Sequence, residues 1–211
     1  MTNKIKLPYR ILFLLIALFA LIWYFFQMVV FRAYGITFAN GFLNYISYFT
    51  IQSNWLVAFW WSIAILKPKS PILQPKIKGA FTTYITVTLA GYAALLASTW
   101  NPQGVDLLLS SITHYVTPLA FILDWFLFEQ RSVYQWRFLI AWLPYPLLYF
   151  GYAMLHGTLT GNFLYPFFDY NALGWKGLAI QALLLLIFFL LVACFYIGVN
   201  KRWKTSQKGA I

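Results

Sequence analysis

The side chains that could do chemistry concentrate between Asn44 and Asn54, in an otherwise apolar part of the chain. Six of these eleven residues carry an amide or an aliphatic hydroxyl group, and two more are tyrosines. Polar groups are costly in hydrocarbon unless they are paired, so at membrane depth they usually face a bundle interior or a water-filled cavity. At about 100° per residue, one half of a helix would hold five of them: Asn44, Ser47, Thr50, Ser53 and Asn54. We therefore expect this polar stripe to line an internal pocket.

Thr50 and His114 are suited to act together as a nucleophile and its base. A threonine hydroxyl is weakly nucleophilic at neutral pH and needs a general base within hydrogen-bond reach, and an imidazole titrates in the useful range. Acyl transfer also needs donors for the developing oxyanion, for which the candidates are Ser53, Asn54 and Tyr165. A second interpretation is open, in which the threonine bonds its own helix backbone and the histidine is an interfacial anchor.

Further polar residues are expected near the same pocket as substrate-binding or supporting groups: Ser47, Thr117, Asp124 and His156. Asp124 shares a flank of its predicted helix with His114, and an ionisable group at membrane depth is a functional candidate. Its alternative role is structural, as an acceptor for a neighbouring helix or a partner of Arg131 or Arg137.

Metal and cofactor chemistry is not indicated. The two histidines, one cysteine and four carboxylates show none of the close spacings that zinc or iron sites use. Cys194 is the single cysteine, so no intrachain disulfide can form, and its apolar surroundings favour a packed residue over a reactive thiol. The sequence therefore predicts no metal site and no cofactor.

The composition is that of an integral membrane protein. Of the 211 residues, 62% are hydrophobic and only 9% are charged, whereas a soluble domain carries about 25% charged residues. The net charge of +11 does not indicate nucleic-acid binding, because the basic residues lie in short loops between apolar runs. The length suits one membrane domain, residues 1–211, without a separate soluble domain.

Apolar runs of about 20 residues, each long enough to cross a bilayer, divide the chain into six spans. We place the spans at residues 8–31, 42–66, 80–99, 110–128, 136–155 and 176–199. Prolines exclude a continuous helix through Lys67–Gly79, and Pro144 and Pro146 predict a kink in the fifth span. Small and hydroxyl residues in the third span favour close helix packing. The sixth span is predicted to be a lipid-facing wall, and residues 156–175 the longest non-spanning stretch.

The distribution of basic residues predicts the orientation. Thirteen of the fifteen lysines and arginines fall at the termini or in the even-numbered loops, and only Arg32 and Lys176 fall in the odd-numbered loops. Because cytoplasmic loops are enriched in lysine and arginine, we expect an all-α, six-transmembrane-helix bundle with both termini cytoplasmic, multi-pass in the cell membrane. Thr50 would then lie roughly 12 Å below the outer boundary, at about 1.5 Å per residue, with His114 at a similar depth.

Three segments together carry a resemblance to a known family: YFTIQSN at 48–54, THYVTPL at 113–119 and TGNFLYPF at 160–167. The chain resembles bacterial six-span membrane proteins related to the androgen-induced membrane hydrolases. Animal members of that family are threonine hydrolases that cleave fatty acid esters of hydroxy fatty acids. The resemblance covers most of the chain, although only these three segments are specific.

The resemblance implies roles for individual residues. Thr50 matches the family's nucleophile, which lies in a Tyr-Leu-Thr segment of the second span, and His114 matches the essential histidine before a proline in the fourth. The interval from His114 to Pro118 is one residue shorter than in the family, which an irregular helix turn or an imperfect match would explain. His156 lies near a family histidine without aligning with it.

Three functions remain open from the sequence. The first is a membrane-embedded lipid ester hydrolase that uses Thr50 and His114 on an acyl ester. The second is a non-catalytic binder of a lipid or small molecule, or a transporter component, although no repeat and no charged pathway favours active transport. The third is a scaffold with an aromatic contact surface. Membrane lipids are the expected partners in the first two.

Overall fold

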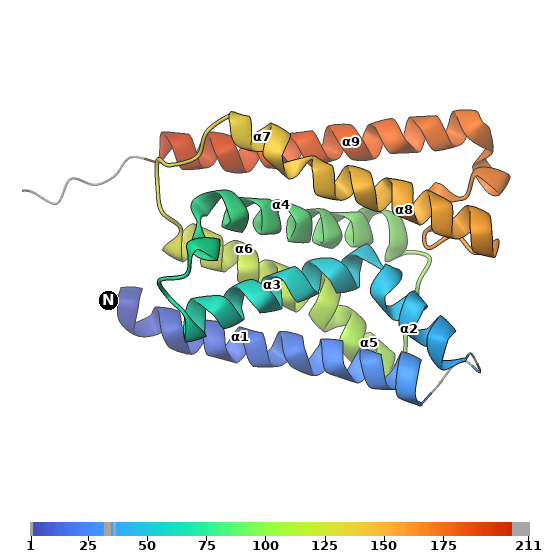
Figure 1. Ribbon diagram of the computed structural model, residues 1–211, viewed down its shortest axis with the longest axis horizontal. Coiled ribbons are helices and arrows are strands. Elements are labelled where there is room, and N and C mark those ends of the chain that lie inside the picture. Colours follow the sequence, from blue (N-terminus) through green and yellow to red (C-terminus); the bar gives the residue numbers. More distant parts are fainter. Residues whose placement is uncertain (1, 32–34, 36, 204–211) are drawn as a thin grey trace, which may run out of the picture.

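The structure is a computed structural model that describes residues 2–31, 35 and 37–203. In this part of the chain every regular element is helical, as the composition predicted. Six segments are long and apolar enough to cross a membrane: Lys4–Val30, Phe49–Leu66, Pro75–Leu96, Gly104–Phe128, Arg137–Thr160 and Tyr170–Arg202. They run side by side along the long axis of the molecule (Figure 1). The protein is therefore an all-α, six-span bundle of the multi-pass membrane type.

The elements follow one another in this order: α1 (Thr2–Phe25), a π-helical turn (Phe26–Val30), α2 (Phe38–Ser47), α3 (Phe49–Leu66), a 3-10 turn (Pro71–Leu73), α4 (Pro75–Gly91), a π-helical turn (Tyr92–Leu96), α5 (Gly104–Ser111), a π-helical turn (Ile112–Val116), α6 (Thr117–Phe128), α7 (Arg137–Trp142), α8 (Pro144–Thr160), a 3-10 turn (Pro166–Phe168) and α9 (Tyr170–Arg202).

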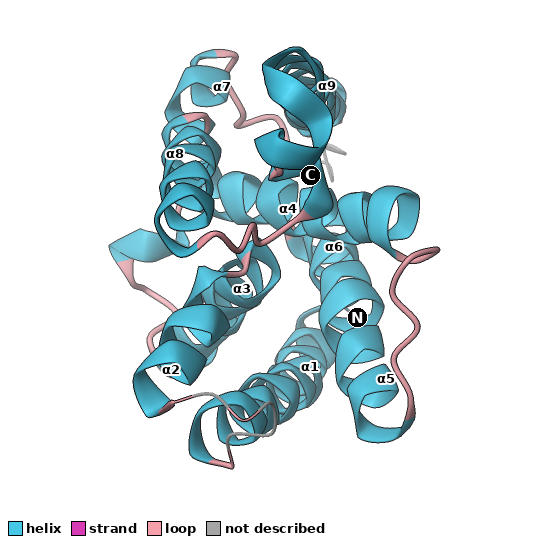
Figure 2. Ribbon diagram, turned by 90° about the vertical axis from the view of Figure 1, so that its right-hand side faces the viewer, coloured by secondary structure: helices cyan, strands magenta, loops and turns pink. Residues whose placement is uncertain are grey.

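Helix α4 lies at the centre of the bundle and packs against α3, α6 and α9 (Figure 2). Its buried face holds Gly79, Ala80 and three threonines, Thr82, Thr83 and Thr88. Each of these threonines donates its hydroxyl to the carbonyl four residues back. The small side chains bring the helices close, and each hydroxyl has an acceptor in its own helix. The close packing expected for the third span is confirmed.

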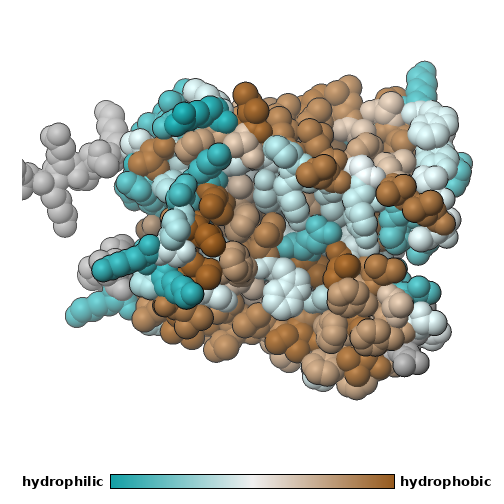
Figure 3. All heavy atoms as spheres, viewed as in Figure 1, coloured by the Kyte–Doolittle hydropathy of each residue, from teal (hydrophilic) through white to brown (hydrophobic). Residues whose placement is uncertain are grey.

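On the face seen in Figure 3, hydrophobic side chains cover most of the middle of the bundle, and the most hydrophilic ones gather toward its ends. Helix α9 contributes a row of large exposed residues: Leu183, Leu184, Ile187, Leu191 and Phe195. Its other face enters the core with Phe189, Ala193, Tyr196 and Ile197. The sixth span is thus a lipid-facing wall on one side, as predicted, and part of the core on the other.

The predicted continuous helix over 42–66 is wrong at Tyr48, where the backbone is extended and α2 ends before α3 begins. A break inside the bundle leaves backbone groups that need partners. The hydroxyl of Tyr149 donates to the carbonyl of Ser47 at 3.0 Å. The amide of Phe49 donates to the hydroxyls of Tyr149 and Tyr165, both at 3.1 Å. Tyr149 and Tyr165, about one hundred residues later in the chain, therefore supply the hydrogen bonds that the backbone loses at the break.

Several other boundaries also differ from the prediction. Helix α4 begins at Pro75, inside the predicted loop, because a proline fits the first turn of a helix. Helix α8 extends to Thr160, which shortens the predicted 156–175 connection to residues 161–169. The carboxylate of Asp169 then accepts from the first amides of α9 and caps it. The predicted kink at the prolines is present as the break between α7 and α8.

Gly79→Ala is expected to lower the free energy of unfolding by about 1–3 kcal/mol, since it overpacks the core. An added Cβ would lie 2.5 Å from Cζ2 of Trp142 and 2.8 Å from the hydroxyl of Tyr134, both buried. Gly151→Ala in α8 is the matched control, because its Cβ would meet nothing within 4 Å. Thermal unfolding of the detergent-solubilised protein measures both. Equal stability of the two variants would contradict the packing at this crossing.

Candidate active site

Thr50 is the second residue of α3, directly after the break at Tyr48. Its hydroxyl lies 3.2 Å from Nε2 of His114, which belongs to the π-helical turn between α5 and α6. The predicted contact between these two side chains is therefore confirmed. Thr50 does not lie two turns inside a continuous helix, as the sequence suggested, but at a helix N-terminus.

Thr50 differs from most threonines inside the bundle in what its hydroxyl bonds, and Thr117, whose hydroxyl has no partner among the described residues, is the other exception. Five threonines donate to the carbonyl four residues back in their own helix: Thr82, Thr83, Thr86, Thr88 and Thr113. Thr50 makes no such bond among the described residues, and the carbonyl of Ile46 instead accepts from Gln52 at 2.9 Å. The break at Tyr48 removes the helical turn that a threonine hydroxyl normally bonds. The interpretation in which the hydroxyl of Thr50 only bonds its own helix backbone is therefore the weaker one.

His114 is held in the tautomer that a general base requires. Its Nδ1 lies 3.0 Å from the backbone carbonyl of Ser110, which can only accept a hydrogen bond. Nδ1 must therefore carry the proton, and Nε2 keeps its lone pair toward Thr50. The hydroxyl of Thr50 is the donor in the 3.2 Å contact. This polarity is the one in which an imidazole removes a proton from a hydroxyl.

The ring of His114 is fixed from its flat side by Tyr92. The two rings are stacked, with centroids 3.8 Å apart and planes at 17°. The hydroxyl of Ser110 lies 3.1 Å from Nδ1 of His114 and 3.2 Å from the hydroxyl of Tyr92. His114 belongs to a π-helical turn, and such turns are frequent at functional sites.

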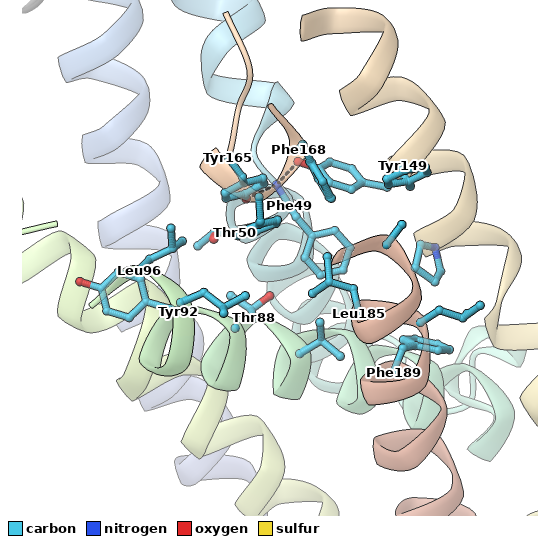
Figure 4. A pocket seen from close by; sticks show the side chains of 18 of the residues that line it. Phe49, Thr50, Thr88, Tyr92, Leu96, Tyr149, Tyr165, Phe168, Leu185 and Phe189 are labelled. Atoms are coloured by element: carbon cyan, nitrogen blue, oxygen red, sulfur yellow. Dashed lines mark hydrogen bonds between the residues drawn. The ribbon is translucent and has the colours of Figure 1, made fainter. Parts of the chain in front are cut away.

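Hydrogen-bond donors surround the start of α3, where an oxyanion next to Thr50 would form. The hydroxyl of Tyr165 accepts from the amide of Phe49 and also contacts the backbone and side chain of Thr50 (Figure 4). Burial raises the pKa of Tyr165, so its phenol stays protonated and keeps a hydrogen to donate. The first amides of a helix have no partner within it and favour negative charge. Tyr165 is thus the oxyanion candidate that the geometry favours.

Ser53 and Asn54, the other two oxyanion candidates, are committed elsewhere. The amide nitrogen of Asn54 donates to the carbonyls of Thr50, at 2.8 Å, and Thr113, at 2.9 Å. It ties α3 to the turn of His114, so it positions the pair rather than facing a ligand. The hydroxyl of Ser53 lies 3.1 Å from the carbonyl of Thr50 and 2.8 Å from the hydroxyl of Thr88.

Thr50 lines a cavity of about 320 Å³ between α3, α4, α8, α9 and the 161–169 loop (Figure 4). Most of the wall is apolar, with side chains that include Leu95, Leu96, Phe150, Leu186 and Phe189. The hydroxyl groups are those of threonines and tyrosines: Thr50, Thr88, Tyr92, Tyr149 and Tyr165. A mostly apolar wall with a few convergent polar groups is typical of a small-molecule site.

The structure does not bring all the predicted supporting residues to this cavity. Ser47 is buried at the end of α2, where its hydroxyl bonds the carbonyl of Leu43 and the hydroxyl of Tyr152. Thr117 is buried, and its hydroxyl has no hydrogen-bond partner among the described residues. His156 is half-buried in α8 and its Nδ1 lies 3.2 Å from the carbonyl of Asn162. None of the three lines the cavity.

Asp124 lies ten residues beyond His114, about 15 Å along the helix at 1.5 Å per residue. Its carboxylate forms ion pairs with Arg10, at 2.7 Å, and Lys78, at 2.6 Å, and accepts from the indole of Trp61. The expectation that it supports the substrate site is therefore wrong, and so is the pairing with Arg131 or Arg137. Its cationic partners come from α1 and α4, which the sequence does not place beside it, and the bond from Trp61 of α3 agrees with the alternative role as an acceptor for a neighbouring helix.

No sequence pattern singled out three residues that contribute to the site: Ser110, Tyr92 and Tyr149. Ser110 precedes His114 by four residues, and this spacing predicts that the two side chains lie on the same face of a helix. Tyr92 and Tyr149 lie on other helices, and no local pattern relates them to Thr50.

Together these features define a class of protein: a six-span helical membrane bundle with a half-buried threonine–histidine pair beside an apolar cavity. No family model, no curated protein and no solved structure matches the chain.

Proposed function

We propose that the protein is a membrane-embedded lipid ester hydrolase in which Thr50 is the nucleophile and His114 the base. One observation carries the proposal: the hydroxyl of Thr50, a residue that lines the apolar cavity, makes no bond to its own helix and donates to Nε2 of His114 behind it. The resemblance of the three sequence segments to the androgen-induced membrane hydrolases supports the same assignment.

The proposed reaction uses an acyl-threonine intermediate. Oγ1 of Thr50 attacks the ester carbonyl carbon while its proton passes to Nε2 of His114, and the carbonyl oxygen becomes an oxyanion near the hydroxyl of Tyr165. The ester C–O bond then breaks, and Nε2 returns the proton to the leaving alkoxide. Water, deprotonated by the same imidazole, cleaves the acyl-threonine and regenerates Thr50.

The cavity suits one acyl chain of a membrane lipid. Its walls from α8 and α9 belong to helices that also face lipid, so a chain could enter sideways from the bilayer. With both termini cytoplasmic, as the lysine and arginine distribution predicts, Thr50 and His114 would lie in the outer half of the cell membrane.

Covalent labelling of Thr50 tests this function. The purified protein is incubated with a fluorophosphonate probe that carries a long alkyl chain, and the modified peptide is identified by mass spectrometry. We expect the label on Thr50, competition by a long-chain ester, and no label in Thr50→Ala. A protein that hydrolyses no ester and takes no label would refute the proposal.

Ala182→Trp is expected to lower hydrolysis of long-chain esters by about tenfold or more and to spare acetyl esters, because it fills the acyl cavity without touching the pair. Ala182 lines the cavity from α9. Ala179→Trp, three residues earlier on the exposed face of the same helix, is the matched control. The ratio of kcat/KM for palmitoyl and acetyl esters is the measurement. A uniform loss for both esters would contradict the placement of the chain.

A non-catalytic lipid binder is the second candidate, and the apolar cavity favours it equally. It predicts that Thr50→Ala binds a fatty acid or lipid as tightly as the wild type does. Under this function the labelling experiment gives no adduct, while Ala182→Trp still weakens binding.

A further inference from the structure

A second cavity, of about 450 Å³, opens at the end of the bundle where α1 begins and α6 ends. It shares no lining residue with the cavity beside Thr50. Three cationic side chains line it, Lys6, Arg10 and Lys78, and among its described lining residues only Glu129 is acidic. The proposed hydrolase reaction makes no use of this cavity.

The acidic groups around this cavity already have their hydrogen bonds. Asp124 accepts from Nε and Nη2 of Arg10, from Lys78 and from the indole of Trp61. Glu129 lies 3.3 Å from the ammonium of Lys78 and also accepts from the backbone of Gln130. Neither carboxylate therefore needs a further cation.

Three hydrogen-bond donors of the cavity have no hydrogen-bond partner among the described residues. Lys6 is half-buried and forms no ion pair with any described residue, and Nη1 of Arg10 likewise makes no hydrogen bond in the described part of the chain. The side chain of Trp60 also lines the cavity, is only 4% exposed, and its Nε1 has no partner among the described residues. Two of the three donors belong to cations, so a ligand that only accepts hydrogen bonds and carries negative charge complements them.

We propose that this cavity binds a phosphate group. Phosphate offers several acceptor oxygens and a negative charge, and arginine and lysine are its usual partners in proteins. The walls also contain Leu7, Leu73 and Phe128, which suit the glycerol and upper chain of a phospholipid. Basic pockets between membrane helices are known sites for anionic lipid headgroups. A free phosphate would use the same donors without the apolar walls.

Native mass spectrometry of the full chain in detergent tests this proposal. Dioleoyl phosphatidic acid is the probe, dioleoyl phosphatidylcholine the neutral comparison, and inorganic phosphate the competitor. We expect phosphatidic acid to bind more tightly than phosphatidylcholine. Lys6→Gln should weaken its binding by about tenfold, the size expected for one charge-assisted hydrogen bond. Lys69→Gln, an exposed lysine of the neighbouring loop that does not line the cavity, should leave binding unchanged.

The outcomes separate the two sources of phosphate. Displacement of phosphatidic acid by inorganic phosphate shows that the cavity recognises the phosphate itself, and tight lipid binding without displacement shows that it takes a phospholipid. Equal binding of the two lipids, or equal effects of Lys6→Gln and Lys69→Gln, would overturn the proposal. Arg10→Lys keeps the charge near Asp124 but removes Nη1. It should weaken phosphatidic acid binding while thermal unfolding confirms that the variant is folded.

Discussion

Removing either member of the pair, by Thr50→Ala or His114→Ala, is expected to lower ester hydrolysis by about 10³-fold or more. A nucleophile and its base act as one unit, so the double variant should be no slower than the slower single variant. The geometry supports this coupling, because the hydroxyl of Thr50 lies 3.2 Å from a nitrogen whose tautomer is set by the carbonyl of Ser110. Rates with a chromogenic acyl ester, measured on folded protein, give the result.

Ser110→Ala is the matched control for the histidine variant. It removes the hydroxyl beside Nδ1 of His114 but leaves the backbone carbonyl that holds the proton there. Activity should therefore stay within a few-fold of the wild type, as expected for the loss of one neutral hydrogen bond worth about 1 kcal/mol. Full activity in His114→Ala would exclude the histidine as the base, whatever Thr50 does.

Asp124→Asn is expected to lower the free energy of unfolding by about 3–5 kcal/mol, since it leaves Arg10 buried without its counter-charge and Lys78 with Glu129 alone. The carboxylate is fully buried, with Arg10 at 2.7 Å and Lys78 at 2.6 Å. Thermal unfolding in detergent should show the loss directly, because a buried charge without a partner is among the largest effects of a single substitution.

Asp106→Asn makes the same chemical change at a site without a cation. Asp106 is half-buried and accepts one hydrogen bond from Gln27. The loss of this hydrogen bond should lower the free energy of unfolding by about 1 kcal/mol or less. If the two asparagine variants were equally stable, the ion pairs of Asp124 would add nothing to stability.

Helix α3 and the π-helical turn of His114 contribute differently to the proposed site. The N-terminus of α3 places the hydroxyl of Thr50 at the end of the helix dipole that favours developing negative charge. The π-helical turn aims Nε2 of His114 at that hydroxyl while its other nitrogen stays bonded to its own helix. Asn54 joins these two elements through the carbonyls of Thr50 and Thr113. The pair is thus positioned by backbone irregularities rather than by regular helix.

The sequence by itself determined the number of spans and their approximate positions. Crossing a bilayer requires about 20 apolar residues with every backbone group bonded within the helix, and this requirement is local. Residue chemistry also selected Thr50 and His114, because polar side chains are rare at membrane depth and usually functional. The threonines of α4 also predicted its close packing, because each hydroxyl can bond a carbonyl of its own helix and needs no space for another partner.

Only the tertiary structure decided the break at Tyr48, since no proline or glycine marks it. The chain can leave the helix there because Tyr149 and Tyr165, about one hundred residues away, bond the freed carbonyl and amide. In the same way, the partners of Asp124 come from α1 and α4, which meet it only in the folded bundle. Buried polar groups must be satisfied, but which groups satisfy them depends on which helices become neighbours.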